Sequence, residues 1–96
     1  AASLHPKEAR EILDLALNSR FIDARKKLLG LMIDRGLSGL DVIKALHREI
    51  ISLDVTDVQK AQLIDKLGEY EFRIAEGGTE DLQIEAFLAQ VSALSN

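Results

Sequence analysis

The chain has 96 residues, a hydrophobic fraction of 47% and a formal net charge of −4 at pH 7, which indicates one compact domain with one core. It contains no cysteine, which excludes disulfides and thiolate zinc sites, and its acidic balance argues against a surface devoted to nucleic-acid phosphates. Its apolar runs are too short to cross a membrane and no signal-peptide pattern occurs, so we expect a cytoplasmic protein with no membrane partner.

The first predicted helix covers residues 6–19 and begins with a proline. Pro6 suits the first helical position, where its fixed φ and missing N–H cost nothing. The apolar residues recur at spacings of three and four, as one buried side requires. They are Ala9, Ile12, Leu13, Ala16 and Leu17. We expect residues 1–5 to be a cloning remnant or the stump of a longer chain, and residues 6–96 to form the helical domain.

The second and third helices are predicted from a glycine cap and a capping box. The second covers residues 20–35 and is closed by Gly36, which can adopt the left-handed conformation that ends helices. Its expected buried residues are Phe21, Ala24, Leu28, Leu31 and Met32. Ser38 caps the third helix, with Asp41 three residues on, and this helix is expected to run to about residue 52.

The fourth and fifth helices are separated by Gly77 and Gly78. The fourth begins near residue 58. Its expected buried residues are Val58, Ala61, Ile64, Leu67, Ile74 and Ala75. Thr79 caps the fifth, whose first turn carries carboxylates that complement the helix dipole. No strand pattern with a period of two competes, so the predicted fold class is all-α, a compact five-helix bundle.

The fifth helix is apolar on two opposite sides when its residues are placed 100° apart. The small stripe consists of Leu82, Ala86, Ala89 and Ala93. The bulky stripe consists of Ile84, Phe87, Leu88, Val91 and Leu94. Two interpretations remain open: a central helix surrounded by its own four partners, or a peripheral helix with one side on its own bundle and the other on another chain.

Two polar residues interrupt apolar faces. His47 lies within the apolar face of the third helix and Glu71 within that of the fourth, which predicts a hydrogen bond between them as a buried polar pair. No serine, cysteine or second acid is positioned to complete a catalytic arrangement. We therefore expect a structural polar contact or an exposed edge of the bundle, and no catalytic or metal-binding residue.

The second helix carries basic residues on its outer side, which would suit phosphate or an acidic partner, or simply a solvated surface. They are Arg20, Arg25, Lys26, Lys27 and Arg35. The segment MIDRGLSGLDVIKALHREI also has the outline of a helix-turn-helix, although acidic residues accompany the exposed cations of its second helix. Neither Gly-rich phosphate-binding motif occurs, so we expect that this chain alone does not hydrolyse a nucleotide.

Two long segments, ARKKLLGLMIDRGLSGLDVIKALHREI and LIDKLGEYEFRIAEGGTEDLQIEAFLAQVSAL, resemble the C-terminal helical domain of clamp-loader small subunits, the replication factor C family, and most closely its archaeal members. The more specific parts are Gly36-Leu37-Ser38, then His47-Arg48-Glu49, and then Phe72-Arg73-Ile74. The resemblance covers nearly the whole chain. It implies an oligomerisation domain that packs beside its neighbours in a closed collar.

The resemblance also implies what lies elsewhere in such a protein. In this family AAA+ ATPase modules precede the collar, bind ATP and magnesium, and let the ring load a sliding clamp onto primed DNA during replication. The matching segments contain none of those modules, so we expect this fragment to have no enzyme activity and no cofactor. The implied partners are other clamp-loader subunits, in a homo- or hetero-oligomer, and the sliding clamp and primed DNA through the complete assembly.

Lateral packing in a collar would explain the two-sided fifth helix. On this view the expected contact residues are Ile84, Phe87, Leu88, Val91 and Leu94, together with Arg73 and Gln83. The last two could equally stabilise the junction of the final helices. A stand-alone helical adaptor that presents a groove to a partner helix is the alternative function, followed by a DNA-binding bundle.

Overall fold

The computed structural model describes residues 3–94 and contains five helices in this part of the chain. They are α1 (Pro6–Leu17), α2 (Phe21–Arg35), α3 (Gly39–Ile50), α4 (Asp57–Ala75) and α5 (Glu80–Leu94). The described residues form no strand. The predicted all-α fold class and the five predicted helices are therefore confirmed.

The helix ends follow the local chemistry of the sequence. The Ser38 hydroxyl accepts a hydrogen bond from the Asp41 N–H at 3.1 Å, and the Asp41 carboxylate accepts one from the Ser38 N–H at 3.0 Å. The hydrogen bond from the Ser38 N–H to the Asp41 carboxylate lowers the pKa of Asp41. Gly36 ends α2 with φ at 63°, in the left-handed region. Thr56 and Gln59 form a second capping box, which starts α4 one residue earlier than predicted.

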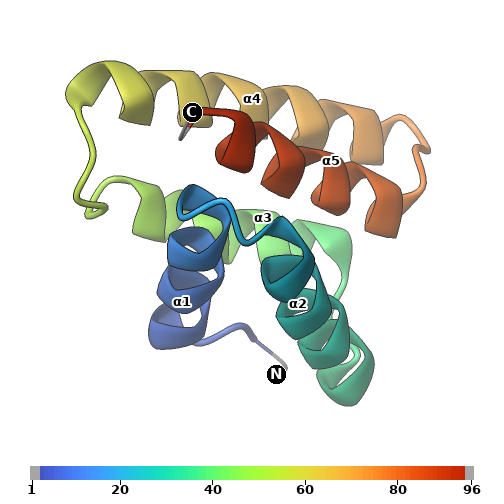
Figure 1. Cartoon of the computed structure of the whole chain (residues 1–96). Coiled ribbons are helices and arrows are strands. Elements are labelled where there is room, and N and C mark those ends of the chain that lie inside the picture. The colour runs from blue at the N-terminus through green and yellow to red at the C-terminus, as the bar shows by residue number, and fades with distance from the viewer. Residues whose placement is uncertain (1–2, 95–96) are drawn as a thin grey trace.

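The helices are arranged around α5. Figure 1 shows α4 and α5 as an antiparallel pair, with α1 and α2 crossing beneath them and α3 between the two groups. α5 contacts each of the other four helices, whereas α1 contacts α2, α3 and α5, and α2 contacts only α1 and α5 among the described helices. The last helix is therefore central within its own bundle, which is the first of the two interpretations of its sequence.

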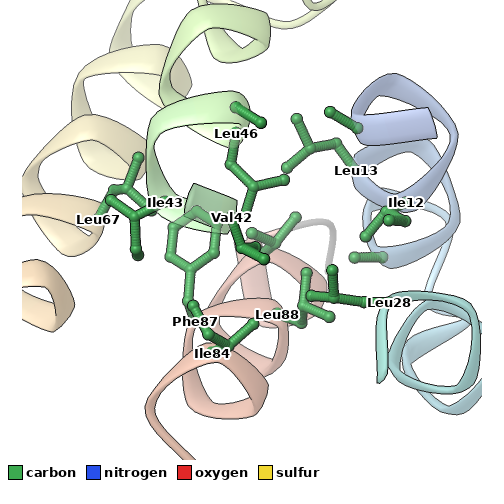
Figure 2. Close-up of a cluster of buried hydrophobic side chains, with 14 of the residues drawn as sticks. Ile12, Leu13, Leu28, Val42, Ile43, Leu46, Leu67, Ile84, Phe87 and Leu88 are labelled. Carbon is green, nitrogen blue, oxygen red and sulfur yellow. The ribbon is translucent and has the colours of Figure 1, made fainter. Parts of the chain in front are cut away.

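The core joins side chains from all five helices, as Figure 2 shows for ten labelled residues. Phe87 lies at its centre with 0% exposure, and its ring meets that of Tyr70 edge-on, with 6.3 Å between the centroids. None of the buried residues in the described part is polar or charged. The core is thus a single apolar cluster.

Three predicted core assignments on α4 are corrected. Val58 is 68% exposed, and Ala61 and Ala75 are exposed too, because the buried face is rotated from the predicted one. It consists of Leu63, Leu67, Tyr70 and Ile74. α4 packs on α3 and α5 along this one face, so its apolar residues elsewhere stay in solvent.

The start of the folded unit also differs. Leu4 is 2% exposed and belongs to the core, and the Ser3 carbonyl accepts a hydrogen bond from Arg35 at 3.2 Å. The boundary predicted at Pro6 therefore excludes a core residue. Ala1 and Ala2, from the same predicted stump, lie outside the described residues. Within residues 3–94 no helix has the length and apolarity that a membrane span requires.

Candidate interaction surface

The bulky stripe of α5 faces inward. Ile84, Phe87, Leu88 and Val91 all have 0% exposure, and Leu94 packs partly buried against the core. Side chains without exposed surface cannot contact a neighbouring chain, so the expectation that these four form a subunit interface is corrected. The physical reason is the central position of α5, because four helices cover the stripe from within the same domain.

The small stripe of α5 faces outward instead. Leu82 is 57% exposed, Ala89 and Ala93 are exposed, and Ala86 is half-buried. On one flank of the stripe, Glu85 forms an ion pair with Arg25 of α2. The four positions of the stripe leave an apolar strip, small at its three alanines, on which another helix backbone can approach closely.

Ser92, on the same flank of α5 as Glu85, connects α5 to α1. Ser92 donates a hydrogen bond to the Ala16 carbonyl at 2.7 Å. This hydrogen bond to α1 and the ion pair between Glu85 and Arg25 of α2 hold α5 against both helices. The outward stripe is therefore presented on a fixed support, which favours recognition by preorganised contact.

Arg73 and Gln83 lie on either side of the turn between α4 and α5. The Arg73 carbonyl accepts a hydrogen bond from the Gly78 N–H at 2.8 Å, and its guanidinium lies 5.0 Å from the centre of the Tyr70 ring and 2.7 Å from Glu69. The Oε1 atom of Gln83 is buried and has no hydrogen-bond partner among the described residues. The Arg73 side chain thus contacts residues of its own helix, and both predicted roles of these residues, at the junction or between subunits, stay predictions.

A hollow of about 260 Å³ lies between α3 and α4. It is lined by Ile43, Lys44 and His47 from α3 and by Ile64, Leu67, Gly68 and Glu71 from α4. His47 and Glu71 are both exposed, and the described structure records no hydrogen bond between them. The predicted buried polar pair is therefore wrong, although both residues line the same hollow. Helical periodicity places each at the edge of an apolar face, where burial and exposure differ by a small rotation.

Gly68 also lines this hollow, although it was not among the residues predicted from the sequence. A glycine inside a helical pattern was the available signal, because it costs stability unless something needs the space.

The basic side of α2 is largely neutralised by acids of the same chain. Arg35 forms a two-fold ion pair with Glu8 at 2.5 and 2.7 Å, and Lys27 contacts Glu11 at 2.6 Å. The hydrogen bond from Arg35 lowers the pKa of Glu8 from 4.5 to about 2, and Lys27 lowers the pKa of Glu11. Cations committed to such pairs are poorly placed to bind phosphates, which disfavours the DNA-binding alternative.

Arg20 and Arg25 are paired as well, with Asp23 and Glu85. Three of the five basic residues thus join α2 to α1 or α5, Arg20 pairs at the start of α2, and Lys26 is exposed with no ion pair in the described structure. Within residues 3–94 no group of three or more metal-binding side chains comes together.

Comparisons with known proteins agree on one family. Residues 4–90 match the family model described as the replication factor C C-terminal domain. Replication factor C small subunits are similar to the chain at 46% identity over 94 residues in Archaeoglobus fulgidus, 49% over 92 residues in Staphylothermus marinus and 42% over 94 residues in Thermococcus kodakarensis. These alignments cover 98%, 94% and 98% of this chain, but only 30%, 28% and 11% of the relatives.

Proposed function

The chain belongs to the replication factor C C-terminal domain family, and on that premise we propose that it is the oligomerisation module of a clamp-loader small subunit. The observation that carries the proposal is the surface left after the core is complete: a rigidly held α5 with an outward apolar stripe, centred on Leu82 and Ala86. A domain that only had to fold would gain solubility from polar side chains there.

The proposed role is mechanical. Subunits of a closed ring contact their neighbours through two unlike faces, each of which repeats around the ring. Five packed helices would provide a block that sets the angle between neighbours. ATPase modules attached to such blocks would be held in a ring that loads a sliding clamp onto primed DNA.

This chain spans less than a third of the relatives it matches, so the chemistry belongs in our proposal to the rest of the protein. ATP and magnesium would bind the ATPase modules there. The chain itself would act by binding other clamp-loader subunits, and would meet the clamp and the DNA through the complete assembly.

The solution mass of the 96-residue chain tests the proposal. Sedimentation equilibrium from low micromolar to millimolar concentration should show a rise in mass that persists at high salt, because apolar contacts are weakly screened by ions. A strict monomer over this whole range, alone and in mixture with the ATPase-bearing subunit of the same assembly, would refute an oligomerisation module.

The hollow between α3 and α4 favours a second candidate, the helical adaptor, because an apolar hollow between two helices suits a side chain of a bound helix. The two functions differ in stoichiometry. An adaptor stays monomeric until its ligand is added, whereas a collar module associates with copies of itself or with its sister subunits.

A further inference from the structure

We propose that the hollow between α3 and α4 receives Leu82 on the outer stripe of α5 from a second copy of this chain, in a head-to-tail contact. The inference rests on the proposed function and specifies which two faces meet. Three features carry it: an unneeded glycine in the hollow, the opposite positions of the two faces, and their complementary charges.

Gly68 has no role within the chain that would require a glycine. It lies inside α4, and a Cβ added there would meet no other atom within 4 Å. Alanine at such a position would stabilise the helix by about 1 kcal/mol, because glycine has more backbone freedom to lose on folding. In contrast, a Cβ on Gly78 would lie 2.8 Å from the Arg73 carbonyl oxygen, so that glycine is explained by its own fold. The space above Gly68 is therefore free for an atom from outside.

The floor of the hollow is apolar and suits an apolar side chain from a partner. Ile43 and Leu67 are 3% exposed each, and Ile64 is half-buried beside them. A branched aliphatic side chain that covers this floor removes apolar surface from water on both partners. Leu82 is such a side chain, and because it is 57% exposed, more than half of its surface can still be buried in a contact.

The hollow and the outer stripe lie on different sides of the bundle, which head-to-tail contact requires. α5 contacts α3 and the core through its inward stripe, so its outer stripe points away from them. On α4, Gly68 lines the hollow, whereas the Tyr70 ring meets Phe87 of α5. At 100° per residue, Gly68 and Tyr70 lie about 160° apart around α4. One copy can therefore offer its stripe while its own hollow stays open to the next.

Charge fixes how the faces meet. Leu82 follows Glu80 and Asp81 in the first turn of α5, and the described structure gives neither acid an ion pair. Lys44, exposed on the α3 wall of the hollow, makes no ion pair there either. Glu71 on the α4 wall repels carboxylates, so the acidic start of α5 must lie on the Lys44 side.

Single cysteines test the contact directly, because the natural chain has none. Gly68→Cys and Leu82→Cys are each purified, mixed in equal amounts and oxidised, with Lys7→Cys on α1 replacing either one as the control. A disulfide between positions 68 and 82 should form in the mixture about tenfold more than in any control pair. Cross-linking of 68 to 68 in preference, or equal yields with the Lys7→Cys control, would overturn the inference.

A filling variant separates this inference from the proposed function. A Cβ at position 68 meets no atom within 4 Å, so Gly68→Trp should keep the helical circular-dichroism signal while it fills the hollow, and it should weaken self-association at least about tenfold. Gly68→Ala adds only a methyl group to the same space and should weaken self-association less. If all three chains associate equally, the hollow is not the contact and the oligomerisation function stands. If the natural chain is monomeric to millimolar concentration and no cross-link forms, this inference fails. The proposed function fails with it if the chain also stays monomeric in mixture with the ATPase-bearing subunit.

Discussion

The carboxylate of Glu8 accepts hydrogen bonds at the ends of two helices. It accepts the His5 N–H at 3.0 Å at the start of α1, and it pairs with Arg35 at the end of α2. The charged hydrogen bonds stabilise the ionised form, which is why the pKa of Glu8 falls from 4.5 to about 2. A lowered pKa in the folded state means that this group stabilises the fold above its unfolded pKa and stops doing so as the pH falls through its folded pKa.

We predict that Glu8→Gln lowers the free energy of unfolding by about 1 kcal/mol at pH 7. The difference from the natural chain should be complete above about pH 5, shrink as the pH falls below 4.5, and vanish near pH 2. Urea unfolding followed by circular dichroism at several pH values measures it, with Glu76→Gln at an exposed position as the control. A difference that is constant from pH 7 to pH 2 would contradict the ion-pair explanation.

Two glycines should respond oppositely to alanine. A Cβ on Gly78 would lie 2.8 Å from the Arg73 carbonyl oxygen, whereas one on Gly30, inside α2, meets nothing within 4 Å. We expect Gly78→Ala to destabilise the fold by about 1–3 kcal/mol through the displaced turn, and Gly30→Ala to stabilise it by about 0.5–1 kcal/mol. Thermal unfolding of both variants decides, and a gain in stability for Gly78→Ala would show that the turn relaxes freely.

At the scale of the helices, the sequence predicted most ends because caps are local. Ser38 and Asp41 are three residues apart and form reciprocal hydrogen bonds, so the start of α3 can be predicted without any distant contact. The choice of buried side was less accessible. α5 has two apolar sides, and only the position of the other four helices decides which one is inside. For α4 the same dependence rotated the buried face from the predicted one toward Leu63 and Tyr70.

The reversed assignment of α5 changes what substitutions should do. Phe87→Ala removes a fully buried ring from the centre of the core, so it should cost about 3–5 kcal/mol and unfold much of the population. Ala89→Asp, on the exposed stripe, should leave the unfolding curve nearly unchanged. Urea unfolding of the two variants compares the stripes, and a stable Phe87→Ala would return the bulky stripe to the list of interface candidates.

At the scale of the molecule, the candidate site was only half accessible from the pattern of residues. The two stripes of α5 and the polar interruptions at His47 and Glu71 were visible as anomalies, and both anomalies lie on surfaces that now carry the proposals. Their meaning required the fold, because a hollow forms from residues of two helices whose relative rotation no local pattern specifies. Gly68 shows this most clearly, since its open space exists only beside α3.

A head-to-tail assembly makes a prediction about charge that only the whole molecule can test. Lys44→Glu places a carboxylate opposite the acidic start of the neighbour's α5, so it should weaken self-association about tenfold at low salt and less at high salt. Adding Asp81→Lys to the same chain reverses the other partner of the contact, and every interface then regains an opposite-charge pair. Sedimentation should show the double variant associating more strongly than either single variant. If the two substitutions instead weaken association additively, Lys44 and Asp81 do not meet, and the acidic end of α5 lies elsewhere on its neighbour.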